Sequence, residues 1–90
     1  MIRLDIKKWT VQIKEKPVFV TRSEFKVLRR LAMSEGEVVT RGSLIRDVFK
    51  GSATNRNVDY HVCQLRGKLP VGAIRTVWGV GYSVQGVKIA

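Results

Sequence analysis

The sequence contains a single cysteine, Cys63, and a single histidine, His61. One cysteine excludes a disulfide bond within the chain, and these two residues cannot supply the four ligands of a structural zinc site. We therefore expect no bound metal and no cofactor. Cys63 is interpreted as an incidental helix residue and not as a redox sensor, because a sensor thiol needs a resolving partner.

Long apolar runs and secretion signals are also missing. The longest apolar runs have only a few residues, whereas a membrane-spanning helix needs roughly 20. The N-terminal residues lack the charged, apolar and small-residue pattern of a signal peptide. We expect a cytoplasmic protein in which residues 1–90 form one domain, because a chain of 90 residues without repeats or linkers supports only one core.

Acidic residues are scarce. Seven Asp and Glu stand against 17 Lys and Arg, which gives a net charge of +10. A small domain with this excess usually binds a polyanion, either a nucleic acid or an anionic membrane. The basic residues are spread along the chain and do not form one amphipathic helix, which argues against a membrane surface. One histidine and no paired carboxylates argue against acid–base catalysis, so an enzyme is not expected.

Residues 2–20 predict a small antiparallel sheet with one covered face. Apolar and polar residues alternate over residues 2–7 and again over 9–14, which is the period of a half-buried strand. Lys14–Lys16 is the expected turn, and Pro17 is expected to open a short third strand over residues 18–20. The residues expected to face the core are Ile2, Leu4, Ile6, Trp9, Val11 and Ile13.

Residues 21–50 predict two helices. Thr21 and Glu24 have the spacing of a capping box at the start of the first helix, and Gly36 is expected to end it with a left-handed backbone. Thr40 is expected to cap the second helix. The apolar stripe of the second helix is Leu44, Ile45, Val48 and Phe49.

A third helix is predicted from about Asn55 to Leu69, before Pro70 ends it. Its residues divide into a narrow apolar stripe and a polar outer face. The stripe is Val58, Val62, Leu65 and Leu69, and the outer face is Asn57, Tyr60, His61, Gln64 and Lys68. Asn and Gln side chains bond the edge of adenine in the major groove, so this face is a candidate for reading DNA. The alternative is an ordinary solvated helix face.

Residues 71–86 predict a β-hairpin. Ile74–Val77 and Tyr82–Val84 flank Trp78–Gly81, whose two glycines are expected to supply the positive φ of a tight turn. With Arg75 beside it, such a hairpin can lie along a DNA backbone or minor groove, or be a plain surface hairpin. Trp78 is expected to fold back onto the domain, and contact with DNA sugars or a protein is the alternative.

Four segments of this sequence resemble one known family. Glu24–Leu28 and Gly36–Leu44 are similar to the first two helices of OmpR/PhoB-type transcriptional regulators, Arg56–Leu69 to their recognition helix, and Ile74–Tyr82 to their wing. The resemblance implies an α+β winged helix-turn-helix fold, with an N-terminal antiparallel sheet, three helices and a C-terminal hairpin wing. It also implies sequence-specific binding of double-stranded DNA, with the recognition helix in the major groove and the wing at the minor groove.

The resemblance assigns three groups of site residues. The phosphate-binding group is Arg56, His61, Arg66 and Lys68. The base-reading group is Asn57, Tyr60 and Gln64, and the wing group is Arg75, Thr76 and Trp78. Trp78 stands where many members of the family have an arginine inserted in the minor groove.

The expected partner is double-stranded DNA, on which members of the family often bind direct repeats as head-to-tail dimers. The second hypothesis is a protein-interaction module on the same fold, in which Trp78 and the loop Lys50–Thr54 contact RNA polymerase or another regulator. No receiver domain is present in residues 1–90, which is expected either for an excised domain or for regulation by another signal.

Overall fold

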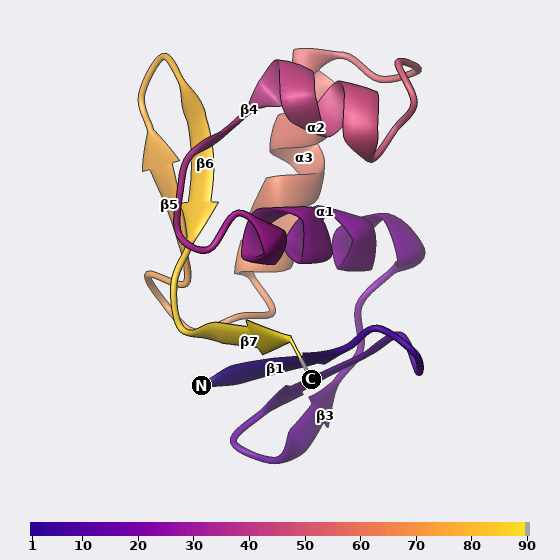
Figure 1. Ribbon diagram of the computed structural model, residues 1–90, viewed down its shortest axis with the longest axis vertical. Coiled ribbons are helices and arrows are strands. Elements are labelled where there is room, and N and C mark those ends of the chain that lie inside the picture. The colour runs from indigo at the N-terminus through magenta and orange to yellow at the C-terminus, as the bar shows by residue number, and fades with distance from the viewer. Residues whose placement is uncertain (90) are drawn as a thin grey trace.

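Residues 1–89, which the computed structural model describes, form two small sheets and three helices, with α1 above the four-stranded sheet and below α2 (Figure 1). The four-stranded sheet has the order β3 (Lys16–Val18), β2 (Thr10–Ile13), β1 (Ile2–Asp5) and β7 (Val87–Ile89). The three-stranded sheet has the order β4 (Val39–Thr40), β6 (Gly81–Val84) and β5 (Ile74–Val77). The helices are α1 (Arg22–Met33), α2 (Arg41–Asp47) and α3 (Asn55–Arg66). This architecture confirms the predicted α+β winged helix-turn-helix fold.

The N-terminal sheet is antiparallel over its first three strands, as predicted, and gains a fourth strand that was not. β1 pairs antiparallel with β2, and Leu4 lies opposite Val11. β3 is an edge strand, which is where a sheet tolerates Pro17. β7 pairs in parallel with the other side of β1, so Leu4 also lies beside Ile89. Three residues that follow Gly86 carry too little alternation to predict such a strand.

Two residues expected in the core of this sheet are exposed, because the strands are shorter than the alternation suggested. Asp5 ends β1, and its Oδ1 accepts hydrogen bonds of 3.0 Å from the backbone N–H groups of Lys7 and Lys8. This turn leaves Ile6 41% and Trp9 40% exposed. The third strand also differs from the prediction, because it covers Lys16–Val18 and leaves Phe19 in solvent.

The helix termini follow the capping signals in the sequence. At α1, Thr21 Oγ1 accepts from the Glu24 backbone N–H at 3.2 Å, and a Glu24 carboxylate oxygen accepts from the Thr21 N–H at 2.9 Å. Gly36 has the expected positive φ of 88° after the helix ends. Thr40 caps α2 as predicted, through the Ser43 N–H at 3.0 Å.

The core lies where the inner faces of the three helices meet the two sheets. The predicted stripe of α3 is confirmed, because Val58, Val62 and Leu65 have no exposed surface. α3 ends at Arg66 and not at Leu69, and its C-cap is Gly67, a residue type that disfavours continuing a helix. Other fully buried side chains are Leu4, Val27, Leu28, Leu31 and Leu44.

The two glycines of the wing have different roles. Gly79 has a φ of 77° and supplies the turn between β5 and β6, as predicted. The prediction was wrong for Gly81, which does not have a positive φ. A Cβ on Gly81 would lie 2.1 Å from the carbonyl oxygen of Val39 and 2.8 Å from the Cα of Thr40. Gly81 therefore lets β4 approach β6 closely, and β4 in turn leads directly into α2.

Gly81→Ala is expected to destabilise the domain by about 3 kcal/mol, because the new methyl group collides with backbone atoms that cannot move independently. Thermal and urea unfolding measure the loss. Gly42→Ala in α2 is the matched control, since its Cβ meets nothing closer than 3.8 Å and alanine favours a helix. Equal stability of the two variants would contradict this packing role.

Candidate nucleic-acid interface

The outer face of α3 presents part of the predicted polar set to solvent. Arg56 and Gln64 are exposed, and Tyr60 is 59% exposed. The inner face of α3 packs against α1 and α2, so these three side chains point away from the body of the domain. They form an open surface with one cation, one phenol and one amide.

Asn57 is exposed, as expected of the outer face, but its amide oxygen is already bound within the domain. Its Oδ1 accepts hydrogen bonds of 3.0 Å from both the backbone N–H and the hydroxyl of Thr54, which closes the capping box of α3. A bidentate bond to adenine requires both the oxygen and the nitrogen of an amide. Such a bond at Asn57 would therefore break the cap of the helix that presents it.

His61 lies at the border between α3 and the end of α2. Its ring stacks on Phe49, with 5.2 Å between centroids and 24° between planes, and meets the edge of Tyr60 at 5.5 Å. The side chain is half-buried. These contacts connect the two helices and position the ring of Tyr60.

Arg66 turns from α3 toward the wing. Its Nε and one terminal nitrogen donate to the carbonyl oxygen of Ile74 at 3.3 and 3.2 Å, and the same terminal nitrogen donates to Thr76 Oγ1. The guanidinium also lies over the ring of Tyr82, 5.5 Å from its centroid. Arg66 and Thr76, expected at phosphate and wing contacts, thus join α3 to β5.

Lys68 was expected on the outer face of α3 and lies elsewhere, because the helix ends two residues before it. Its Nζ donates to a carboxylate oxygen of Glu24 at 2.6 Å, and it also lies over the ring of Phe19. Glu24 is buried, with 3% of its surface exposed. The pair ties the end of α3 to the start of α1 and leaves Glu24 with a charged partner.

Tyr82 is the centre of a polar cluster that sequence reasoning missed. Its hydroxyl donates to Oδ1 of Asp59 at 2.5 Å, and Arg41 Nε donates to the same oxygen at 2.8 Å. The Arg41 guanidinium lies 5.9 Å from the centroid of the Tyr82 ring. Asp59 is on α3, Arg41 on α2 and Tyr82 on β6, so the cluster joins both helices to the wing. The three residues are 18 to 41 positions apart, and no local pattern connects them.

The wing tip is open to solvent. Arg75 is exposed, and Trp78 is 88% exposed, so the expectation that Trp78 folds back onto the domain was wrong. Val80 is also half-exposed, at 49%. The tip therefore presents an apolar surface beside the exposed side chain of Arg75. Figure 1 shows this hairpin extending beside α2 and α3.

Residues 15–84 match the family described as "Transcriptional regulatory protein, C terminal". The chain belongs to this family. Its fold is that of the OmpR/PhoB-type winged helix domains, and the family is one of transcriptional regulators and not of enzymes. Within residues 1–89, none of the helices has the length and apolar character required to cross a membrane.

Relatives with known names agree with this assignment. The chain is 44% identical over 70 residues to the transcriptional regulatory protein VxrB of Vibrio cholerae, a match that covers 76% of this chain and 29% of VxrB. It is 35% identical over 83 residues to PmrA of Pectobacterium parmentieri, covering 90% of this chain and 37% of PmrA. The chain thus spans about a third of the length of these curated relatives.

Solved structures give the same result. The DNA-binding domain of the response regulator AdeR, crystallised with an intercistronic region, superposes with a TM-score of 0.85 at 31% identity and covers 92% of each chain. DrrB of Thermotoga maritima, an OmpR/PhoB homologue, gives a TM-score of 0.83 at 32% identity over 92% of this chain and 41% of that one.

The Tyr82 cluster perturbs the ionisation of its members in this regulatory domain. Burial opposes the charge of Asp59, but the hydrogen bonds from Tyr82 and Arg41 outweigh it and lower the pKa of the Asp59 carboxyl. Burial and the Asp59 carboxylate raise the pKa of the Tyr82 hydroxyl, so it remains a donor at neutral pH. The hydrogen bond from Arg41 to Asp59 raises the pKa of the guanidinium further. The ionised form of Asp59 is the one that the cluster stabilises.

Because the pKa of Asp59 is lower in the folded than in the unfolded state, its contribution to stability is present above about pH 4 and lost as pH falls through the folded pKa. Acidification lowers the free energy of unfolding, and Asp59→Asn is expected to reduce this loss by about 0.5 kcal/mol. The figure is small because solvent screens the half-exposed carboxylate. Urea unfolding between pH 7 and pH 2 measures it. Glu37→Gln, an exposed carboxylate outside the ion pairs, is the control. An unchanged acid slope in Asp59→Asn would refute the assignment.

Proposed function

We propose that this domain binds double-stranded DNA sequence-specifically and thereby regulates transcription. In the proposed complex, α3 enters the major groove and the β5–β6 wing contacts the adjacent minor groove. The observation that carries the proposal is the hydrogen-bonded connection between an open polar helix face and an exposed hairpin, made by Arg66 and Tyr82. The AdeR domain, which has the same fold and was crystallised with an intercistronic region, supports it.

The proposal gives the predicted site residues different roles. Tyr60 and Gln64 are the base readers, because both are exposed on the outer face of α3. Arg56 neutralises a phosphate at the start of α3, where the helix dipole also favours an anion. Arg75 and Trp78 are the wing contacts. Five other candidates act first as structural supports: Asn57, His61, Arg66, Lys68 and Thr76.

The net charge of this surface is modest, which affects its mode of binding. Its exposed cations are Arg56, Arg75 and Arg66, and the hydrogen bonds of Arg66 already go to β5. Tyr60, Cys63 and Gln64 are uncharged. Affinity from phosphate neutralisation grows with the number of cations that approach the backbone. We therefore propose that one domain binds weakly and that two domains occupy a direct repeat head to tail. Site selection from a random duplex library tests this arrangement through the spacing of the enriched half-sites.

Arg56→Ala and Gln64→Ala are expected to have different effects on DNA binding. Arg56→Ala weakens binding to all duplexes alike and makes the log K against log salt slope shallower by about 0.9, because one phosphate contact is lost. Gln64→Ala leaves the salt slope unchanged and loses about 1–3 kcal/mol of discrimination at one base pair. Fluorescence anisotropy over a salt series measures both, with Lys16→Ala on the far sheet as control. Unchanged base preference in Gln64→Ala would mean that α3 is wrongly placed.

A protein-interaction role for the wing is the second candidate, and the exposure of Trp78 is the observation in its favour. Under this second candidate, the partner of the wing is RNA polymerase. Under the main proposal, Trp78→Ala reduces affinity for duplex DNA about tenfold, the size of one lost aromatic contact. Polymerase recruitment to the promoter should then fall only in proportion to DNA occupancy. Intact DNA affinity with lost polymerase contact would favour the second candidate.

A further inference from the structure

The positive charge of this domain is concentrated away from α3 and the wing. Of the 17 Lys and Arg in the sequence, α3, the turn after it and the wing contain four, and two of those, Arg66 and Lys68, make internal contacts. A second group lies on the β1–β2 turn, on the outer stripe of α1 and after α2. These elements form the edge opposite the wing in Figure 1. The group is Lys7, Lys8, Arg22, Lys26, Arg29 and Lys50.

A hollow of about 280 Å³ opens on this edge, between α1 and the end of α2. We call it the Trp9 hollow. Its apolar wall is formed by Trp9, Met33 and Val48. Four cations line it, and one of them, Arg30, pairs with Asp47. The other three, Lys26, Arg29 and Lys50, belong to none of the four ion pairs found within residues 1–89.

Trp9 is held at the surface in an unfavourable backbone conformation. Its φ is +57°, in the left-handed region that is sterically unfavourable for residues other than glycine. Asp5 fixes the preceding turn, and the Trp9 ring stacks on Phe25 at 4.9 Å between centroids. The guanidinium groups of Arg22 and Arg29 lie 5.5 and 5.8 Å from the ring centroid. The fold thus holds a partly exposed aromatic ring among cations, where the sequence alternation predicted a core residue.

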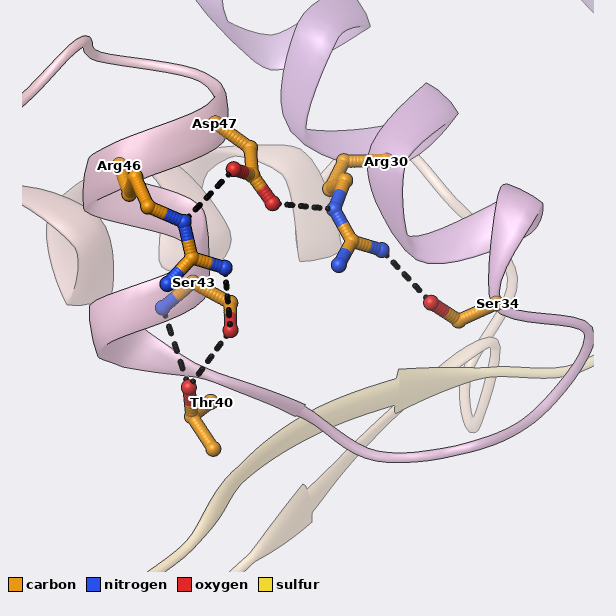
Figure 2. Close-up of polar contacts among 6 residues, drawn as sticks. All are labelled: Arg30, Ser34, Thr40, Ser43, Arg46 and Asp47. Carbon is orange, nitrogen blue, oxygen red and sulfur yellow. Dashed lines mark hydrogen bonds and ion pairs between the residues drawn. The ribbon is translucent and has the colours of Figure 1, made fainter.

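The carboxylate that lines the hollow, Asp47, does not neutralise those cations. Figure 2 shows it between Arg30 and Arg46, which donate to its two oxygens at 3.0 Å each. These hydrogen bonds hold the pKa of Asp47 below its ordinary value, so it stays ionised and paired. The second Arg30 nitrogen donates to Ser34. The charges of Lys26 and Arg29 therefore remain available to a ligand.

We propose that the Trp9 hollow binds an acidic segment of a partner protein that also carries an apolar side chain. The carboxylates of the segment would pair with Lys26, Arg29 and Lys50, and its apolar side chain would cover Trp9 and Met33. Charge complementarity selects an acidic ligand. The surroundings of Trp9 favour protein over nucleic acid, because a base needs an open ring face to stack on. Phe25 stacks on the Trp9 ring, and the guanidinium groups of Arg22 and Arg29 also lie over it.

The site is separate from the proposed DNA surface, so both can be occupied together. The Trp9 hollow is built from α1, the β1–β2 turn and the end of α2. The proposed DNA contacts come from α3 and the wing. The inference therefore stands or falls independently of the proposed function.

Trp9 fluorescence tests the proposal in a Trp78→Phe background, where Trp9 is the single tryptophan of the two in the sequence. The probe is a short blocked peptide of repeated Asp-Glu-Leu. It should bind saturably and shift the emission of Trp9, and Lys26→Gln/Arg29→Gln should weaken it about tenfold. Lys16→Gln/Lys88→Gln, which removes the same charge from exposed strand positions, should leave peptide affinity within about twofold.

Three results would overturn the proposal. Poly-glutamate of equal length binding as tightly as the Asp-Glu-Leu peptide would mean that the apolar wall contributes nothing. A single-stranded dT oligonucleotide of matched charge binding more tightly would make this edge a second nucleic-acid surface. An equal loss of peptide affinity in the two double variants would mean that binding depends only on the overall charge of the domain. Thermal unfolding of each variant confirms that it is folded, and duplex DNA binding by Lys26→Gln/Arg29→Gln is expected to be retained.

Discussion

The hydroxyl of Tyr82 is the point at which the two helices of the helix-turn-helix and the wing are fixed to one another. A buried phenol requires a hydrogen-bond acceptor, and Asp59 on α3 supplies it. Arg41 at the start of α2 binds the same carboxylate, and Arg66 covers the ring from the end of α3. Because one aromatic side chain contacts all three elements, the distance between the α3 face and the wing tip is set by the core and not by loop conformation.

Because of these contacts, not every basic residue near α3 is free to bind a polyanion. Arg41, Arg66 and Lys68 are cations of the region around α3, yet each is bound to a carboxylate, a carbonyl or a hydroxyl of the domain itself. Their charge still contributes to the field around the domain. Their hydrogen-bonding capacity, however, is largely used in joining elements. A residue count predicts a polyanion partner without distinguishing these cations from Arg56, which faces solvent.

The sequence predicted the features that depend on neighbouring residues. The capping residues Thr21 and Thr40 and the apolar stripe of α3 follow from spacings of three or four positions, and the structure has them where expected. Features that depend on distant residues were missed. Neither the pairing of β7 with β1 nor the collision that requires Gly81 can be read from local periodicity. The alternation of apolar and polar residues wrongly placed Trp9 in the core, because the turn at Asp5 ends the strand before Trp9.

The parallel pairing of β7 with β1 also limits the order in which the molecule can be made. β1 begins at residue 2 and its partner at residue 87, so one sheet contains nearly the first and nearly the last described residues. The ribosome releases β1, β2 and β3 long before β7 exists, and contacts between such distant residues form slowly. During synthesis the open side of β1 therefore has no partner until the whole wing has emerged. Within this domain, the N-terminal sheet is the first part translated and the last part completed.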